Sequence, residues 1–534
     1  MSDTNRTNQT IIKLPLTRQS HINQLEDFKG AWDICIIGGG ATGLGAAVDA
    51  ASRGYKTILF EQYDFAKGTS SRSTKLVHGG VRYLQQGNVK LVMDALRERG
   101  TLKKNAPHLV KNQSFIVPNY KWWEGPYYGL GLKVYDWMSG SLGLGSSQWL
   151  STEEVLGLAP TLDPEGLRGG VVYHDGQFDD ARLAINLAQT AAEQGGSILN
   201  YFKVDGFLKL NGKITGVQVT DRITGGKYEV SAKAVVNATG VFSDKIQHLD
   251  DKHKKASITP SQGIHVVLDK EFLPGDAAIM IPHTDDGRVL FAVPWHNKII
   301  VGTTDTLVAT ISEEPVPLEE EVQFILQHAS RYLTKDPEKK DIKSIFAGLR
   351  PLVKDTAKKT AEISRDHSVI VSESGLISVL GGKWTTYRKM AEDVVNIAAI
   401  HAALSFAECV TRDLSIHGSD TNIDFSLPGY YYGSDNNELK KISLADSTLS
   451  NPLHSRLPYT PADIIWAIRH EYCMTVEDAL TRRTRSLLLD AAAAIEMAPD
   501  VARIMAEEMQ LDERWQQQQI EQFESLAAQY LPKP

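Results

Sequence analysis

The segment WDICIIGGGATG, residues 32–43, sets the architecture that we predict for this chain. Its β-branched run predicts a short buried strand. Gly38, Gly40 and Gly43 follow at the spacing that permits a tight turn, close approach to a pyrophosphate and packing of a helix on the strand. The small residues of 41–52 predict that helix, whose amino end would present free N–H groups and a positive dipole to an anion. The segment therefore predicts a nucleotide-binding βαβ unit.

The residues after this segment strengthen the prediction. A second strand is expected at 57–60, and it ends at Glu61, whose carboxylate can accept hydrogen bonds from both hydroxyls of a ribose. A glycine-rich turn alone is weak support for a cofactor site. A strand, turn, helix, second strand and acidic residue in register predict dinucleotide binding.

A second glycine-rich loop, Gly381-Gly382-Lys383, repeats this layout far along the chain. It follows a short strand predicted at 377–380 and precedes a helix predicted at 387–403. Two such loops could hold opposite ends of one extended cofactor, and FAD fits that layout. The amino end of the second helix could also stabilise negative charge on the pyrimidine ring of a reduced flavin.

Composition limits the function classes. The 534 residues, with 42% apolar and 23% charged content, are enough for a large core and for two or three domains. The net charge of −8 argues against nucleic acid as the main partner. Cys35, Cys409 and Cys473 are widely separated and form neither a zinc pattern nor a disulfide framework, so we predict no metal site and a reducing compartment.

Membrane-spanning and secretory signals are not predicted. The sequence has no run of about 18 uninterrupted apolar residues, and its amino terminus lacks a charged region followed by an apolar core. We therefore expect a soluble or peripheral protein. Residues 1–30 are polar and mixed in charge, which predicts a flexible amino-terminal extension, with a mitochondrial transit peptide as the alternative.

Turn signals and helical patterns divide the rest of the chain. Three β-prone runs between 200 and 240 are joined by Asn211-Gly212 and Thr224-Gly225-Gly226, which predicts a β-meander that returns to the parallel sheet. From about residue 415 helical patterns dominate, including 462–470 and 476–498. The predicted α/β fold has three parts: the extension at 1–30, a Rossmann-like FAD-binding domain with an interleaved mixed-sheet substrate domain at 31–414, and a carboxy-terminal α-helical domain at 415–534.

Six segments carry a resemblance to a known family along nearly the whole chain. They are IGGGATGLGAAVD at 37–49, TSSRSTKLVHGGVRYL at 69–84, DDARL at 179–183, GTTD at 302–305, GLRPL at 348–352 and GGKWTTYRKMA at 381–391. In these segments the chain resembles the FAD-dependent glycerol-3-phosphate dehydrogenases of the aerobic, respiratory type. Leu44 departs from the family, which usually has a small residue there, and this concerns helix packing more than function.

The resemblance implies a fold, a reaction and a set of partners. The implied fold is that of the glutathione reductase and D-amino-acid oxidase type. The implied reaction is oxidation of sn-glycerol 3-phosphate to dihydroxyacetone phosphate, by hydride transfer to non-covalently bound FAD. Electrons would then pass to a quinone. The protein would lie on the inner face of the cell membrane as a peripheral protein of the cytoplasm, and a homodimer is an open alternative to a monomer.

Cations and histidines supply the residue types that this chemistry needs. Arg82 and Arg350 are the predicted phosphate or oxyanion clamps, because a planar guanidinium binds two oxygens at once. Lys383 would add charge near the flavin ring or the substrate oxygen. His265 is favoured over His78 as the base because the resemblance places it beside the substrate, although either histidine could orient a ligand without moving a proton.

The predicted site residues fall into three groups. The predicted catalytic residues are His78, His265, Arg350 and Lys383. The predicted substrate-binding residues are Arg82, Tyr83, Thr303, Arg350 and Lys383. The predicted cofactor-binding residues are Gly38, Gly40, Gly43, Glu61, Ser70, Ser71, Lys75, His78, Gly79, Gly80, Val204, Ala238, Gly240, Gly382, Lys383 and Thr385.

Some of the matching residues have simpler explanations. Ser70 and Ser71 could cap a helix, or hydrogen-bond to oxygens of FAD. Asp179 and Asp180 begin an amphipathic pattern, which favours helix capping over catalysis, and Arg182 could pair with either aspartate.

An aromatic segment at 122–138 bears on the electron acceptor. Its apolar residues Leu130, Val134 and Trp137 share helical spacing, and such density with few charges predicts an element that lies on a bilayer. A subunit contact or a core helix is the alternative. The segment favours a membrane quinone over a soluble glycerophosphate oxidase that reduces oxygen to hydrogen peroxide. A flavin-bearing membrane-docking protein without turnover is a third possibility, against which the set of cations and His265 argues.

Overall fold

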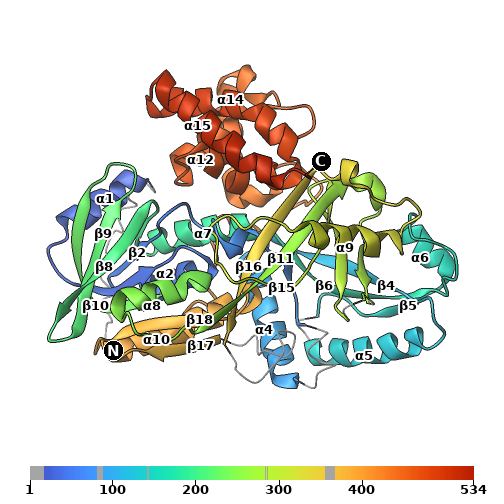
Figure 1. Cartoon of the computed structure of the whole chain (residues 1–534), viewed down its shortest axis with the longest axis horizontal. Coiled ribbons are helices and arrows are strands. Elements are labelled where there is room, and N and C mark those ends of the chain that lie inside the picture. Colours follow the sequence, from blue (N-terminus) through green and yellow to red (C-terminus); the bar gives the residue numbers. More distant parts are fainter. Residues whose placement is uncertain are drawn as a thin grey trace, which may run out of the picture.

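The computed structural model describes residues 17–80, 88–140, 143–282, 284–285, 287–354 and 367–533. Two β-sheets lie side by side, with helices on their outer faces (Figure 1). The carboxy-terminal helices stand at one end of the molecule, and helix α5 lies at the other. The predicted α/β class with mixed sheets is confirmed.

The first sheet contains the predicted parallel strands. Its strands follow the order β17-β18-β10-β1-β2-β7, and β8 and β9 lead as antiparallel strands into β10. The bounds are β1 Trp32–Ile37, β2 Thr57–Phe60, β7 Ser197–Leu199, β8 Phe202–Leu210, β9 Lys213–Asp221, β10 Lys227–Asn237, β17 His367–Val371 and β18 Leu376–Gly381. Strand β1 is parallel to both β2 and β10, so the predicted βαβ unit and the returning meander are confirmed.

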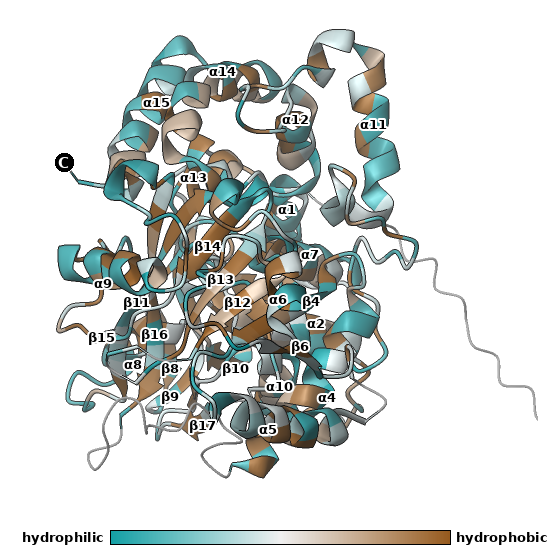
Figure 2. Ribbon diagram, turned by 90° about the vertical axis from the view of Figure 1, so that its right-hand side faces the viewer, coloured by the Kyte–Doolittle hydropathy of each residue, from teal (hydrophilic) through white to brown (hydrophobic). Residues whose placement is uncertain are grey.

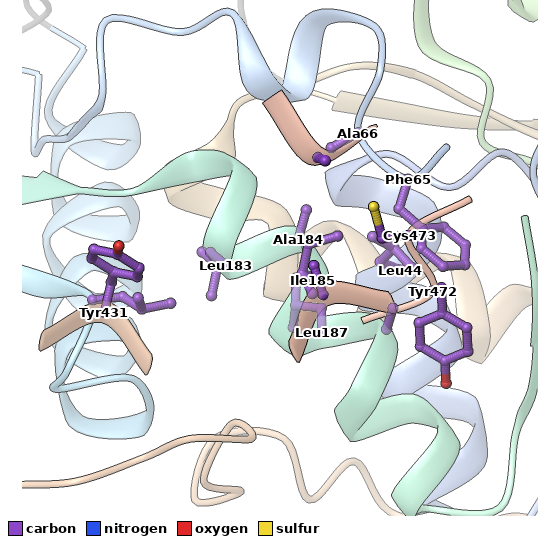
Figure 3. Packing of buried hydrophobic residues seen from close by; sticks show 14 of the residues in the cluster. Leu44, Phe65, Ala66, Leu183, Ala184, Ile185, Leu187, Tyr431, Tyr472 and Cys473 are labelled. Carbon is purple, nitrogen blue, oxygen red and sulfur yellow. The ribbon is translucent and has the colours of Figure 1, made fainter. Parts of the chain in front are cut away.

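Small residues let helices pack closely on this sheet. Helix α2 (Ala41–Ser52) lies against α10 (Tyr387–His401) and α7 (Asp180–Glu193). A side chain at Gly45 would place its Cβ 2.8 Å from the Tyr387 ring. Leu44 is larger than the residue usual in the family, and it is fully buried in the core where these helices meet (Figure 3).

The second sheet is mixed and is built mainly from the middle of the chain. Its strands follow the order β15-β11-β14-β13-β12-β4-β6-β3, with β16 on β11 and β5 on β6. The bounds are β3 Leu76–Val77, β4 Val110–Pro118, β5 Gln148–Leu150, β6 Gly170–Phe178, β11 Ile258–Asp269, β12 Ala278–Ile281, β13 Leu290–Trp295, β14 Lys298–Gly302, β15 Thr306–Leu307 and β16 Ser344–Val353. Further helices in this half are α4 Val89–Asn105, α5 Glu124–Ser139, α6 Thr152–Leu158 and α9 Glu319–Ser330, whereas α8 Ser243–Asp250 lies against β8 and β18 of the first sheet.

The carboxy-terminal part is helical from α11 onward. Its helices are α11 Asn436–Ala445, α12 Pro461–His470, α13 Ser486–Leu489, α14 Ala491–Met509 and α15 Glu513–Ala527. The helical pattern expected at 476–498 is present but interrupted. A π-helical turn (Asp478–Arg483) is followed by a left-handed residue, Arg485, and α14 restarts after its N-cap Asp490. Buried ion pairs of the arginines in this turn override the helical pattern.

Two further predictions needed correction. Residues 17–30 contain helix α1 (Arg18–Asp27), which packs Ile22 and Leu25 into the core and pairs Arg18 with Asp221 at 2.5 Å, so this part is not a flexible lead-in. Residues 1–16 lie outside the described part of the chain. Asp179 does cap α7 as expected, but Arg182 pairs with Glu471 at 2.7 Å rather than with an aspartate.

Helix α5 carries exposed apolar residues at the end of the molecule opposite α14 and α15, and Figure 2 shows it from a second side. In the described ranges of the chain, no helix has both the length and the apolar character needed to cross a bilayer.

Candidate functional site

A cavity of about 910 Å³ lies where the two sheets meet. On one side it is lined by residues at or just beyond the carboxyl ends of β1, β10 and β18. On the other side it is lined by residues of β11 and β16 and by the turn after β14. Binding at the carboxyl ends of parallel strands is the general rule for open α/β sheets. The cavity thus brings together the two glycine-rich loops that are far apart in the sequence.

The first loop forms a cradle that side chains would fill. Gly38 has a φ of +108°, and a Cβ there would lie 2.8 Å from the Ala238 carbonyl oxygen. A Cβ at Gly43 would lie 1.8 Å from the Gly38 carbonyl oxygen. Ser70 Oγ accepts a hydrogen bond from the Ala41 N–H at 3.0 Å, which places a hydroxyl at the amino end of α2. The exposed amino end and the bare turn fit a diphosphate.

Glu61 lies at the end of β2, as the sequence predicts. Its carboxylate accepts hydrogen bonds from the N–H groups of Gly39 at 2.7 Å and of Tyr63 at 2.9 Å. Burial raises the pKa of this carboxyl, although the two backbone N–H groups act in the opposite direction. The carboxylate is therefore held rigidly on the cavity wall, where it suits the hydroxyls of a ribose.

The second loop closes on the segment between residues 70 and 80. Gly382 has a φ of +94°, and a Cβ there would lie 2.2 Å from the Met390 Cε. The Trp384 indole N–H donates to the Ser70 carbonyl at 2.8 Å, and the His78 N–H donates to Thr385 Oγ1 at 3.3 Å. These bonds tie the two ends of the cofactor cavity together.

A group of polar side chains from the second sheet faces the same cavity. The Arg350 Nη2 donates to Thr303 Oγ1 at 3.1 Å, and its Nη1 lies 3.4 Å from Asp305 Oδ1. His265 Nε2 shares a hydrogen bond with Thr74 Oγ1 at 2.9 Å, and its ring stacks on Phe346. The guanidinium and the imidazole are thus each fixed by a neighbouring hydroxyl.

His265 is a neutral imidazole in this setting. Burial, and then the positive charges of Lys75 and Arg350, lower its pKa well below the usual value. Within the described part of the chain, its Nδ1 has no hydrogen-bond partner. A buried neutral imidazole beside a cation can orient a hydroxyl or accept its proton.

The cavity wall includes most of the predicted site residues that the structure describes. Those that line it are Gly38, Gly40, Glu61, Ser70, His78, Gly80, Val204, Ala238, Gly240, His265, Thr303, Arg350, Gly382, Lys383 and Thr385. Arg82 and Tyr83 lie outside the described residues. Their predicted contact with substrate stays a prediction.

Four predicted cofactor residues lie behind the wall instead. Gly43 and Gly79 are packing positions, and Ser71 is buried. Lys75 is fully buried and donates to both carboxylate oxygens of Asp180, at 2.7 and 2.8 Å, and to the Ser71 carbonyl. Any contribution of Lys75 to cofactor binding would therefore be indirect, through the shape of the segment around it.

Sequence reasoning missed several polar residues of the wall, among them Thr74, Asp305 and Arg288. Thr74 and Asp305 lie inside segments that carry the family resemblance, so their position next to predicted residues was a usable signal. Arg288 also lines the cavity, but it follows a loop without any motif. Nothing in the sequence pointed to it.

Comparisons with known proteins agree with this geometry. The family model for FAD dependent oxidoreductases matches residues 33–388, and the model for the C-terminal domain of alpha-glycerophosphate oxidase matches 409–516. The mitochondrial glycerol-3-phosphate dehydrogenase of Schizosaccharomyces pombe is 37% identical over 93% of this chain and 87% of its own length. The human mitochondrial protein of the same name is 39% identical over 95% of this chain and 74% of its own length.

Solved structures lead to the same family. The glycerol-3-phosphate dehydrogenase from Bacillus halodurans, complexed with FAD, superposes with a TM-score of 0.75 at 29% identity, covering 96% of this chain and 97% of that one. The L-alpha-glycerophosphate oxidase from Mycoplasma pneumoniae shares the fold, with a TM-score of 0.54 at 18% identity over 72% of this chain and 98% of that one. The predicted cofactor, FAD, is therefore confirmed, and the chain belongs to the FAD-dependent glycerol-3-phosphate dehydrogenase family.

Proposed function

We propose that this protein oxidises sn-glycerol 3-phosphate to dihydroxyacetone phosphate and passes the electrons to a membrane quinone. The observation that carries the proposal is the pairing of a fixed guanidinium, Arg350, with a neutral imidazole, His265, on one wall of the FAD cavity. A phosphorylated secondary alcohol needs both groups, one for its phosphate and one for its hydroxyl proton.

The cofactor would be held by groups at both ends of the cavity. Gly38, Gly40, Glu61 and Ser70 would hold the diphosphate and ribose, and Gly382 and Thr385 would hold the flavin portion. Bound FAD supplies the acceptor for the hydride from carbon 2 of the substrate. The chain supplies binding, orientation and proton transfer around that step.

Arg350 is the proposed phosphate clamp. Thr303 and Asp305 fix the plane of its guanidinium, so that two N–H groups can meet two phosphate oxygens with little further loss of side-chain freedom. Lys383, just beyond β18, lines the same cavity from the other side and adds a second cation for the dianion or for the substrate oxygen. An uncharged alcohol such as glycerol lacks the phosphate that these cations are proposed to bind and would be a poor substrate.

His265 is the proposed acceptor of the hydroxyl proton. Its lowered pKa keeps the ring neutral, and a bound phosphate dianion would offset the positive field of Arg350 and so strengthen the imidazole as a base. The hydrogen bond between Thr74 Oγ1 and His265 Nε2 holds the ring in one orientation. Proton transfer by a positioned imidazole is worth roughly 100- to 10,000-fold in rate.

Helix α5 supports a lipid-soluble acceptor. Leu130 and Trp137 on this helix are 70% and 83% exposed, and Trp122, just before it, is 80% exposed. Trp123 and Tyr127 belong both to this exposed segment and to the cavity wall. An element that lies on the bilayer would therefore bring a quinone to the edge of the flavin cavity. We propose that the protein attaches peripherally to the inner face of the cell membrane. The Schizosaccharomyces pombe and human relatives named above are mitochondrial proteins.

The acceptor can be tested with the enzyme reduced anaerobically and then mixed with a soluble quinone or with oxygenated buffer. The proposal expects reoxidation by the quinone to be at least about tenfold faster than by oxygen. Equal or faster reoxidation by oxygen, with hydrogen peroxide as product, would favour an oxidase. The match of residues 409–516 to an oxidase domain makes that the alternative to test.

Membrane attachment can be tested in parallel by flotation with anionic phospholipid vesicles. Trp137→Asp should reduce the vesicle-bound fraction several-fold, because it places a charge on the exposed face of α5. Leu444→Asp is the matched control, since Leu444 is 84% exposed but lies on α11, far from α5. Equal flotation of both variants and of the unmodified enzyme would contradict the role of α5.

A further inference from the structure

Three buried polar residues lie next to the cofactor-cavity loop formed by residues 78–80, and one of them, Asp175, also lines the cavity. They come from three different elements: Arg99 from α4, Tyr135 from α5 and Asp175 from β6. All three are almost completely shielded from solvent. None of them belongs to the segments that carry the family resemblance.

The Tyr135 hydroxyl is the centre of this group. It donates to Asp175 Oδ2 at 2.9 Å and accepts hydrogen bonds from the Gly79 N–H at 2.9 Å and from Arg99 Nη1 at 3.3 Å. Arg99 Nη1 also donates to Asp175 Oδ1 at 2.7 Å. Since a phenol has one proton to donate and Asp175 takes it, the oxygen of Tyr135 is left as an acceptor aimed at the backbone of the loop.

Burial keeps this arrangement in one protonation state. Loss of solvent raises the pKa of Tyr135 well above its ordinary value, and the Asp175 carboxylate raises it further. The hydroxyl therefore stays protonated over the whole range in which the enzyme would work. The hydrogen bond to the Gly79 N–H is correspondingly independent of pH.

The loop lies in direct contact with the group. A Cβ at Gly79 would come within 2.3 Å of the Tyr135 hydroxyl oxygen and 2.4 Å of Leu96 Cδ2, so that only a glycine allows this approach. The neighbours His78 and Gly80 both line the cavity. On its other side the loop is held by the bond from the His78 N–H to Thr385.

We infer that Tyr135 is a positioning residue, whose hydroxyl fixes the backbone at Gly79 and thereby sets the place of His78 and Gly80 against the cofactor. Asp175 and Arg99 act through it by orienting the hydroxyl. Helix α5 also carries the exposed residues Leu130 and Trp137 on another face. The position of α5 is therefore coupled to the shape of the cofactor cavity through the Tyr135 side chain.

The test is Tyr135→Phe, which keeps the ring and removes the hydroxyl. The Gly79 amide should exchange its hydrogen about tenfold faster or more, both with and without FAD, because it loses its hydrogen-bond acceptor. The visible flavin band should shift. Under the proposed function, kcat with glycerol 3-phosphate should fall about tenfold while KM changes less than twofold.

Tyr432→Phe is the matched control. Tyr432 is equally buried and donates its hydroxyl to Asp463 at 2.8 Å, but it lies in the carboxy-terminal part of the chain. This control should leave Gly79 exchange, the flavin band and kcat unchanged. If Tyr135→Phe, like the control, leaves Gly79 exchange, the flavin band and kcat unchanged, the inference is wrong.

The measurement of kcat rests on the proposed function, whereas the measurements of Gly79 exchange and of the flavin band do not. If glycerol 3-phosphate fails to reduce even the unmodified enzyme, the proposed function fails, while Gly79 exchange and the flavin band still decide the role of Tyr135. If Tyr135→Phe does not fold, Asp175→Asn provides the second variant. It leaves the hydroxyl in place but weakens its orientation, so faster Gly79 exchange supports the inference and unchanged exchange overturns it.

Discussion

Lys383 shows how much can depend on one side chain in this cavity. It follows two glycines with positive φ, it is half-buried, and it lines the wall beside Thr385 and Gly382. A cation at this place can act on the substrate oxygen or on the cofactor itself. The two roles differ in what its removal would change.

Lys383→Met should slow reduction of the flavin more than it weakens FAD retention. We expect the reduction rate to fall about 10- to 100-fold, because one charge-assisted interaction with the reacting oxygen is lost, while the FAD dissociation constant changes less than threefold. Stopped-flow reduction and cofactor titration measure the two quantities. Lys203→Met is the control, since Lys203 also lines the cavity but pairs with Asp205. A larger loss of FAD affinity than of rate would make Lys383 a cofactor-binding residue.

Single residues were predictable from the sequence when their role is local. Glu61 follows directly from the strand that precedes it, and Asp179 from the helix that it caps. Partners across the fold were not predictable. Arg182 pairs with Glu471, and Lys75 with Asp180, because tertiary packing brings together positions that no local pattern relates.

At the level of elements, His417 joins two parts of the chain. Its Nδ1 lies 2.8 Å from Glu193 at the end of α7, and its Nε2 lies 2.8 Å from Asp435 before α11. Burial lowers the pKa of this histidine, but the two carboxylates outweigh that effect and raise it to about 9. The folded protein therefore binds the proton more tightly than the unfolded chain does.

This bridge predicts a pH-dependent stability. Because the folded pKa is raised, the stabilisation is complete below about pH 6.5 and is lost as the pH rises towards 9. His417→Asn should cost roughly 1–3 kcal/mol of unfolding free energy at pH 6 and much less at pH 9. Denaturant unfolding of the variant and of the unmodified protein at several pH values measures this. A cost for His417→Asn that does not change with pH would refute the bridge.

Elements were predictable where propensity and tertiary structure agree. Helix α2 begins and ends at the predicted residues, and the meander of β8, β9 and β10 follows its turn signals. The helical pattern expected at 476–498 is interrupted where Arg482, Arg483 and Arg485 are all buried. Arg482 pairs with Glu477 and Asp478 inside the segment, but Arg482 and Arg483 also pair with Asp64, and Arg485 lies beside Asp179. These distant partners have no signal in the local apolar pattern.

At the level of the whole molecule, buried charges hold the carboxy-terminal helices to the cofactor unit. Arg483 donates to Asp64 at 2.6 and 2.9 Å, Arg482 pairs with the same carboxylate, and Arg485 lies 3.1 Å from Asp179. The arginines lower the pKa of Asp64 to about 2 despite its burial, so the pairs persist at neutral pH. Removing one partner of such a buried pair typically costs about 3–5 kcal/mol.

The overall architecture was only partly predictable. The two glycine loops indicated a single cofactor held at both ends, and the cavity between the sheets agrees with that. The order of strands in the second sheet had no local signal, because it depends on pairings such as β16 with β11 that close over long separations. Only the family resemblance implied that Thr303, Arg350 and His265 lie close together. The structure supplies a physical cause, which is the pairing of β16 with β11.

The most direct measurement is anaerobic stopped-flow mixing of the FAD-loaded enzyme with sn-glycerol 3-phosphate, followed at the flavin band near 450 nm. Rapid bleaching with glycerol 3-phosphate, and none with glycerol at the same concentration, is the expected result, because we propose that Arg350 and Lys383 bind the phosphate. Absence of bleaching by glycerol 3-phosphate, or equal bleaching by glycerol, would contradict the proposed reaction and the role of these cations.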